Sequence, residues 1–195
     1  MKKLTHDEIS QNRSTLETLH KVKKLPVYAL LNSIRSSYNV GAIFRTSDGA
    51  MIEKLYLCGY TPKPGKTSDP SQRNQAITVK EILKTALGST QSVNWEYVKN
   101  PKEVILKLKQ QGVKICALEM TDKSIPYYNL SIKDFPLCLL VGNEITGVSQ
   151  ELIELCDNSI EIPQYGIKQS LNVAVAYGIA VFELRKIFDL NKTTS

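Results

Sequence analysis

Short apolar runs alternate with longer mixed segments along most of this chain. Five runs have the length and composition of buried strands, namely residues 27–31, 54–58, 113–118, 136–141 and 158–162. Strands that are apolar on both faces are typical of parallel sheets covered by helices. The pattern therefore predicts a sheet of mainly parallel strands.

Capped or amphipathic segments lie between these runs and predict helices. One begins near Val40, one covers about 79–87, one opens at Asn100 and Pro101, and one covers 149–156. Asn100 is a favoured N-cap, and Pro101 fits the first helical position. Strands that alternate with helices predict an open α/β fold with helices on both faces of the sheet.

Residues 5–24 precede the first strand and predict a helical appendage. Thr5 and Glu8 have the spacing of a capping box. Three lysines close the segment: Lys21, Lys23 and Lys24. They are either a solvated helix end or contacts for phosphate. We therefore divide the chain into an appendage at 1–25 and one α/β domain at 26–195.

The last predicted helix, 171–190, begins with an almost wholly apolar half. Such a helix is buried on most of its sides. Small residues such as Ala174, Ala176 and Gly178 also allow another helix to approach closely. That helix belongs either to the same chain or to a second subunit.

Residues 60–75 predict a long exposed loop, because they hold three prolines and few apolar side chains. The loop contains three basic residues: Lys63, Lys66 and Arg73. It is either a plain surface loop or one that closes over RNA.

Several common motifs are absent from the sequence. Five residues separate Gly59 from Gly65, whereas a phosphate-binding P-loop has about four. No stretch matches the glycine pattern of dinucleotide sites or the Gly-x-Ser-x-Gly turn of many hydrolases. These absences speak against nucleotide triphosphatases, ordinary Rossmann enzymes and serine hydrolases.

Composition narrows the remaining classes. The formal net charge of +6 favours a polyanionic partner, but charge alone does not establish that the protein binds nucleic acid. The four cysteines are widely separated and predict buried free thiols. The only histidines are His6 and His20, so we expect no metal site. The N-terminus is charged and no run reaches about 18 apolar residues, so we expect a cytoplasmic protein without a membrane segment.

Two segments hold polar residues beside apolar ones. Asn39 and Arg45 lie on the helix predicted near Val40, and Arg45 follows two apolar residues. Gly142 and Glu144 follow the strand at 136–141, and ligands bind at the carboxyl ends of strands in α/β sheets. The alternative for Glu144 is a solvated residue in an ordinary turn.

A third segment leads into the last helix and contains Ser170 and Asn172. Ser170 fits a helix N-cap, which needs no functional explanation. Asn172 stands directly before an apolar helix, where a buried amide would need hydrogen-bond partners.

In order and spacing, the three segments resemble the three motifs of the SpoU-like branch of the SPOUT RNA methyltransferases. With a further segment at 84–88, the resemblance covers about 26–188. It implies an open α/β sheet whose C-terminal part forms a trefoil knot, an exception to the usual unknotted chain. It also implies a homodimer that uses S-adenosyl-L-methionine to methylate a ribose 2′-hydroxyl in tRNA or rRNA.

The resemblance further implies which residues form the site. Four positions match the family's backbone contacts with the cofactor: Leu118, Gly142, Ile162 and Leu171. Five positions match its polar catalytic set: Arg45, Asn39, Glu144, Ser170 and Asn172. No metal takes part in this chemistry.

Arg45 occupies the position that the family favours for activating the hydroxyl. A guanidinium stays protonated, so we expect Arg45 to act by position and charge and not as a base. Glu144 either orients Arg45 or takes the proton through water. The alternative function is a non-catalytic RNA-binding protein of the same fold, and the complete catalytic set speaks against it.

Overall fold

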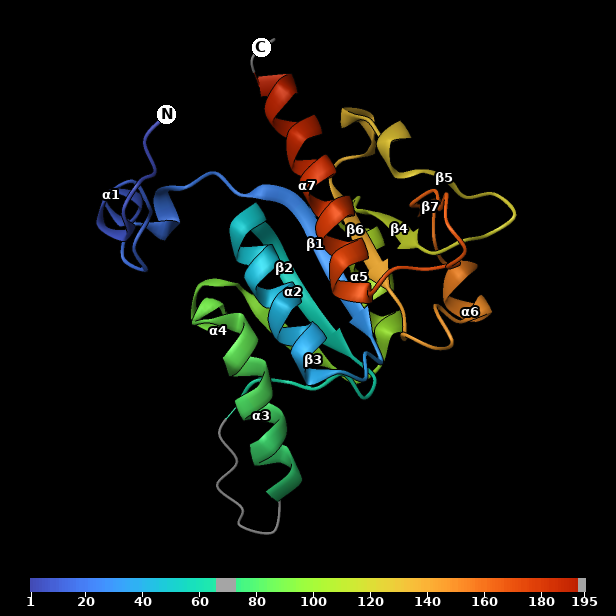
Figure 1. Cartoon of the computed structure of the whole chain (residues 1–195). Coiled ribbons are helices and arrows are strands. Elements are labelled where there is room, and N and C mark those ends of the chain that lie inside the picture. The colour runs from blue at the N-terminus through green and yellow to red at the C-terminus, as the bar shows by residue number, and fades with distance from the viewer. Residues whose placement is uncertain (66–72, 193–195) are drawn as a thin grey trace.

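A computed structural model describes residues 1–65 and 73–192 of the protein. A sheet of seven parallel strands forms its centre, in the order β3-β2-β1-β6-β4-β7-β5 (Figure 1). The strands are β1 Leu25–Asn32, β2 Ile52–Cys58, β3 Trp95–Val98, β4 Lys114–Leu118, β5 Ile125–Pro126, β6 Leu137–Val141 and β7 Asn158–Glu161. The predicted mainly parallel sheet is confirmed.

All five apolar runs form strands within two residues of their predicted bounds. The pattern did not predict β3 and β5, and the reason lies at the two edges of the sheet. All four residues of β3 are only half-buried, and β5 has two residues. Neither edge strand therefore carries a long apolar run.

Helices connect the strands. They are α1 His6–Gln11, α2 Ser37–Ala50, α3 Arg73–Ala86, α4 Ser89–Ser92, α5 Pro101–Gln110, α6 Gln150–Ile153 and α7 Val173–Lys192, with short 3-10 helices at η1 Leu19–Lys21, η2 Tyr127–Asn129 and η3 Ile132–Asp134. The predicted N-cap at Asn100 is confirmed, since its side chain accepts a hydrogen bond from the backbone of Lys102. The helix predicted at 149–156 is much shorter than expected.

Successive residues of the central strands point to opposite faces of the sheet and enter two separate cores. Leu31 and Leu139 belong to the core shared with α2 and α7, which lie together in front of the sheet in Figure 1. Leu30 and Leu140 belong to the second core, where Ile105 of α5 lies. The predicted helices on both faces are confirmed.

The last helix is buried on one side only. Tyr177 is fully buried, whereas Val175 and Phe182 remain 53% and 50% exposed. α2 packs beside α7, but glycine is not required at 178, because a Cβ there would lie in ordinary contact, 3.8 Å from Cγ2 of Thr46. One neighbouring helix thus comes from the same chain, an apolar face stays exposed, and a helix from a second subunit stays a prediction.

The N-terminal prediction of one helix over 5–24 was wrong. The capping box of Thr5 and Glu8 is confirmed, but α1 ends at Gln11 and only η1 follows. Hydroxyls at Thr15 and Thr18 bond with nearby backbone groups and so compete with helical hydrogen bonds. Neither α1 nor η1 contains a buried residue, and the domain boundary at 25/26 stays a prediction.

The first part of the predicted exposed loop is anchored to the sheet. Thr61 is buried, and its hydroxyl donates to the carbonyl of Leu31 and accepts from the N–H of Ile34, both at 3.0 Å. The loop also ends earlier than predicted, because α3 begins at Arg73. Lys66 lies outside the described residues.

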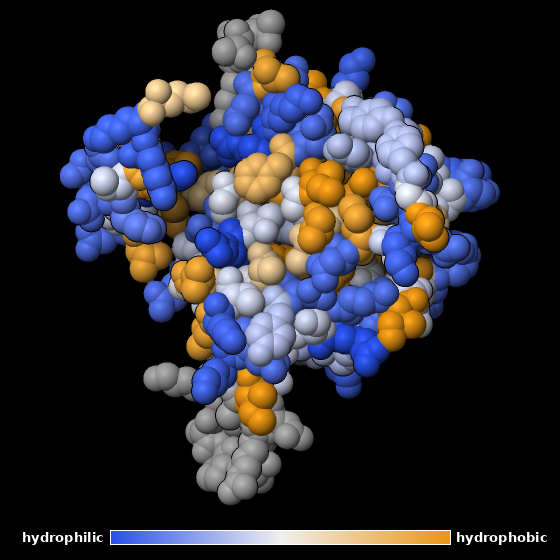
Figure 2. Space-filling model, viewed as in Figure 1, coloured by the Kyte–Doolittle hydropathy of each residue, from blue (hydrophilic) through white to orange (hydrophobic). Residues whose placement is uncertain are grey.

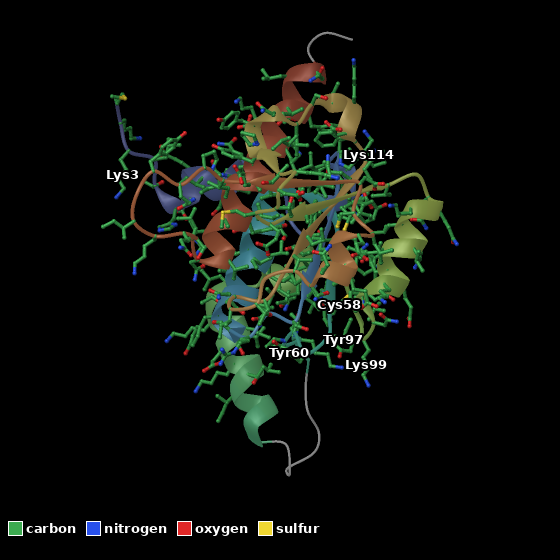
Figure 3. The ribbon with its side chains drawn as sticks, turned by 90° about the vertical axis from the view of Figure 1, so that its right-hand side faces the viewer. Lys3, Cys58, Tyr60, Tyr97, Lys99 and Lys114 are labelled. Carbon is green, nitrogen blue, oxygen red and sulfur yellow. The ribbon has the colours of Figure 1, made fainter. Side chains whose placement is uncertain are left out.

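The cysteines are free thiols, as predicted, and three of the four are buried, among them Cys58 (Figure 3). Burial raises the pKa of Cys58 to about 12 and that of Cys156 to about 11, so these thiols stay protonated and unreactive near neutral pH. Within the described ranges no helix combines the length and apolar content needed to span a membrane. The trefoil knot and the cytoplasmic location stay predictions.

Candidate active site

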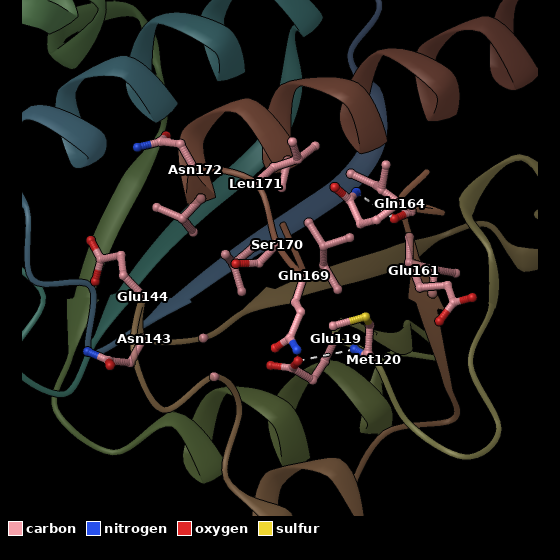
Figure 4. Close-up of a pocket in the computed structure, with 18 of the residues that line it drawn as sticks. Glu119, Met120, Asn143, Glu144, Glu161, Gln164, Gln169, Ser170, Leu171 and Asn172 are labelled. Carbon is pink, nitrogen blue, oxygen red and sulfur yellow. Dashed lines mark hydrogen bonds between the residues drawn. The ribbon is translucent and has the colours of Figure 1, made fainter. Parts of the chain in front are cut away.

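A pocket of about 340 Å³ opens where β4, β6 and β7 end (Figure 4). Leu118 is the last residue of β4, Gly142 follows β6, and Ile162 follows β7. The segment that leads into α7 contributes Leu171 to the fourth side. All four residues predicted to contact a cofactor therefore border one cavity at the carboxyl edge of the sheet, where α/β folds bind ligands.

The loop after β6 closes on itself tightly. Asn143 and Gly147 exchange two backbone hydrogen bonds of 3.1 and 2.9 Å, and Oδ1 of Asn143 accepts from the N–H groups of Ile145 and Thr146. A Cβ on Gly142 would lie 2.3 Å from the backbone carbon of Gly147. Glycine is required at 142 because the two ends of the loop pass in direct contact.

Glu144 points from this loop to the start of α2. Its Oε2 accepts from the N–H of Arg35 at 2.8 Å, and its Oε1 accepts from the N–H of Ser36 at 3.1 Å and from Nδ2 of Asn39 at 3.0 Å. Partial burial raises the pKa of Glu144, but these hydrogen bonds outweigh it and hold the pKa below its usual value. The carboxylate is thus a structural clamp between two motifs.

Asn172 extends the same network to α7. Its Oδ1 accepts from the N–H of Ala174 at 2.9 Å and thereby caps the helix, while its Nδ2 donates to Oδ1 of Asn39 at 3.1 Å. The N-cap interpretation of Ser170 was wrong, because α7 begins at Val173, and Asn172 is exposed and not buried. Ser170 lines the pocket instead.

Two of the five predicted catalytic residues, Asn39 and Arg45, do not line the pocket. Asn39 is joined to it through Glu144 and Asn172, whereas Arg45 lies apart. Arg45 lies on α2 six residues after Asn39, which corresponds to about 9 Å along the axis and about 240° around it. Its side chain is exposed and lines a separate groove with Leu16, Asp48 and Leu87. Within one chain, the described pocket lining does not include Arg45.

Sequence reasoning missed five polar residues that line the pocket, namely Glu119, Asn143, Glu161, Gln164 and Gln169. Glu119 follows β4, and its Oε2 accepts from the N–H of Val148 at 2.9 Å. Asn143 is buried and donates from Nδ2 to the hydroxyl of Tyr60 at 2.7 Å. The signal for Glu119 was its position at the carboxyl end of a predicted strand, the same criterion that selected Glu144.

The described residues contain no group of three or more His, Cys, Asp and Glu side chains suited to a metal ion. The pocket carboxylates accept hydrogen bonds from backbone N–H groups, from an amide and from a hydroxyl instead. That no metal takes part stays a prediction.

Comparisons with known proteins identify the family of this chain and its fold. The family model described as the SpoU rRNA Methylase family matches residues 26–182. A tRNA (guanosine(18)-2'-O)-methyltransferase of Aquifex aeolicus (strain VF5) is 36% identical over 171 residues, which are 87% of this chain and 73% of that protein. The chain spans 58–66% of the length of several other curated relatives.

Solved structures share the fold. The A. aeolicus TrmH/SpoU tRNA modifying enzyme has a TM-score of 0.75 and 29% identity, over 91% of this chain and 84% of that one. An AdoMet-bound rRNA methyltransferase from Sinorhizobium meliloti has a TM-score of 0.68 and 28% identity, over 86% of this chain and 59% of that one. The α/β fold that the sequence predicted is therefore confirmed.

Proposed function

This chain belongs to the SpoU rRNA methylase family, and from that premise we propose that it transfers a methyl group from S-adenosyl-L-methionine to a ribose 2′-hydroxyl of tRNA or rRNA. The observation that carries the proposal is the pocket of about 340 Å³, which is bordered by every residue predicted to contact the cofactor. The relatives named above as tRNA and rRNA methyltransferases support RNA as the substrate.

The pocket fits an adenosyl ligand in size and chemistry. Its volume lies within the range of small-molecule sites, roughly 300–1,000 Å³. Leu118, Ile162 and Leu171 offer apolar surface, while the loops at 142–147 and 162–172 offer backbone donors and acceptors. When bound, the cofactor would supply a methyl group on a positively charged sulfur.

We assign Glu144 a positioning role. Its carboxylate accepts hydrogen bonds from the N-terminus of α2 and from Asn39, and its lowered pKa makes it a weak base. Because Asn172 also bonds to Asn39, this network would fix the positions of the loop after β6, the start of α2 and the start of α7 relative to one another. Ser170 lines the pocket and remains for contact with the ribose.

Arg45 would act in a homodimer. Hydrophobic side chains gather near the middle of the face in Figure 2. Val175 and Phe182 of α7 are half exposed. Arg45 and Tyr38 are exposed on α2, which packs beside α7. If the second copy packs on this α2/α7 face, Arg45 lies in the interface and can approach the pocket of the other subunit.

Arg45 would then bind the ribose hydroxyl or the adjacent phosphate through its planar guanidinium, and its charge would favour the deprotonated oxygen. The remaining predictions belong to the same proposal. They are the trefoil knot formed by the C-terminal part and the division into an appendage at 1–25 and a methyltransferase domain at 26–195.

Two measurements test the function. Calorimetry should detect S-adenosylhomocysteine binding in preference to ATP, and incubation with radiolabelled S-adenosyl-L-methionine and total RNA should yield a 2′-O-methylated nucleoside on hydrolysis. Tight binding of ATP, with no detectable binding of S-adenosyl-L-methionine or S-adenosylhomocysteine, would refute the proposal. RNA binding without methyl transfer would favour the alternative, a non-catalytic RNA-binding protein.

A further inference from the structure

Glu119 lines the pocket but has no role in the reaction proposed above. It is half-buried directly after β4, with Oε2 bonded to the N–H of Val148 at 2.9 Å and Oε1 bonded to the N–H of Met120 at 3.1 Å. A carboxylate has about four lone-pair directions, so two remain available. The backbone fixes the group in place and leaves it able to accept from a ligand.

The other two carboxylates that line the pocket differ from Glu119 in their hydrogen bonds or in their position, since Glu144 is bonded to α2 and Glu161 lies at the pocket's edge. Glu144 accepts three hydrogen bonds from the start of α2. Glu161 accepts from Oγ of Ser124 at 2.8 Å and lies at the edge of the pocket in Figure 4. In the same view the Gln169 amide points toward Glu119, and both residues line the cavity.

We propose that Glu119 recognises the vicinal hydroxyls of the ribose in the pocket's adenosyl ligand, and so makes the pocket selective for an intact ribonucleoside. A vicinal diol presents two O–H donors, and an ionised carboxylate accepts both through charge-assisted hydrogen bonds. A carboxylate at the end of a strand serves the same purpose in dinucleotide sites of other α/β folds. The inference rests on the proposed function, because it takes the ligand to be adenosyl.

The apolar residues assigned to the cofactor support this placement. Leu118 directly precedes Glu119, and Ile162 and Leu171 line the same cavity. A nucleoside has an apolar base face next to a polar sugar, so a cavity with apolar walls beside one fixed carboxylate matches both parts. The loop after β6 borders the same cavity, and the N–H of Val148 at its end donates the hydrogen bond that fixes the Glu119 carboxylate.

Calorimetric titration of the full chain with S-adenosylhomocysteine and its 2′-deoxy and 3′-deoxy analogues tests the proposal. We expect the wild type to bind the intact ligand about 10- to 100-fold more tightly than either analogue. Glu119→Gln should weaken binding of the intact ligand by a similar factor and lose the discrimination. The matched control Glu154→Gln, which changes an exposed carboxylate outside the pocket, should bind and discriminate as the wild type does.

The outcomes separate the inference from the proposed function. Equal binding of intact and deoxy ligands by the wild type would overturn the inference and leave the methyltransferase proposal standing. The inference would also be overturned if Glu119→Gln weakened the binding of all three ligands by the same factor. Glu119 would then affect binding only by supporting the loop at Val148. If Glu119→Gln does not fold, Glu119→Asp retains the charge and should show reduced discrimination. No binding of S-adenosylhomocysteine by the wild type would overturn both.

Discussion

At the scale of single residues, the predicted catalytic side chains differ in their hydrogen bonds. Some bond to other parts of the protein, whereas the Arg45 side chain bonds to no other described residue. Glu144, Asn39 and Asn172 bond with one another and with helix termini. Arg45 forms no hydrogen bond or ion pair with another described residue and is exposed. The guanidinium, unlike the bonded Glu144 carboxylate, has no partner among the described residues, which is what its proposed role in binding the ribose requires.

Arg45→Ala should lower the rate of methyl transfer about 100- to 1,000-fold and leave S-adenosylhomocysteine affinity nearly unchanged, because Arg45 does not line the pocket. Arg45→Lys should be almost as inactive, since lysine keeps the charge but lacks the planar fork. Single-turnover assays with calorimetry measure both effects. Arg185→Ala, on an exposed ion pair of α7, is the control that should stay active. Near-normal activity of the lysine variant would mean that only diffuse positive charge matters.

The Glu144 clamp predicts a dependence of stability on pH. Because its folded-state pKa is lowered below the ordinary value of 4.5, the ionised group stabilises the fold above that pH, and this contribution is lost as the pH falls through the folded-state pKa. Glu144→Gln should lower Tm at pH 7 by about 2–4 °C, or about 1 kcal/mol, and the difference should shrink below pH 4.5.

Thermal melts from pH 3 to pH 8 measure this effect, with roughly one melt per half pH unit. Glu154→Gln is the matched control, because Glu154 accepts only from the exposed Gln150 side chain among the described residues. A Glu144→Gln difference that stays constant across the range would show that the carboxylate's charge contributes nothing.

At the scale of elements, the loop after β6 links the sheet to the cofactor pocket. It is closed by the bridge between Asn143 and Gly147 and braced from β4 by Glu119. The loop thus presents its backbone to the pocket in one conformation. Any side chain at 142 must separate its two ends.

Gly142→Ala should therefore weaken S-adenosylhomocysteine binding at least about 10-fold and lower stability by roughly 1–3 kcal/mol, because the new Cβ meets backbone atoms that cannot rotate away. Calorimetry and thermal melts check the two effects. Gly65→Ala is the control, since a Cβ there meets nothing within 4 Å. Unchanged affinity for Gly142→Ala would remove the loop from the cofactor site.

At the scale of the whole molecule, the pocket and Arg45 lie apart within one chain. The exposed apolar face of α7 offers a way to unite them, because Val175 and Phe182 lie beside the helix that carries Arg45. If the proposed dimer forms through this face, Phe182→Asp should yield a monomer where the wild type sediments as a dimer, and should abolish methyl transfer. A monomer that keeps full activity would contradict the dimeric site.

Mixing two impaired variants, at a cofactor concentration too low to occupy the Gly142→Ala pocket, tests whether Arg45 acts across the proposed interface. Arg45→Ala and Gly142→Ala subunits, unfolded together and refolded, should regain up to about a quarter of wild-type activity, because half of the dimers are mixed and each mixed dimer has one complete site. Refolding each variant alone is the control and should give no gain. If the mixture stays inactive while mixed dimers form, Arg45 serves the pocket of its own chain.

The sequence by itself determined the elements and the family. Strand runs, the Asn100 cap and the three motifs are local patterns, set by periodicity and by residue type over a few neighbouring positions. For this reason β1, β6 and α5 appear close to their predicted bounds. The edge strands were not predicted and the appendage was predicted wrongly, because half-buried or polar segments show little hydrophobic periodicity.

The tertiary structure alone decided what each polar side chain touches. Glu144 meets the N–H of Arg35 across 109 residues of sequence, and Asn172 meets Asn39 across 133. Such contacts arise only when the sheet brings loop ends together, so neither the clamp role of Glu144 nor the ligand-facing position of Glu119 follows from spacing along the chain. The separation of Arg45 from the pocket has the same cause, since it depends on which side of α2 faces α7.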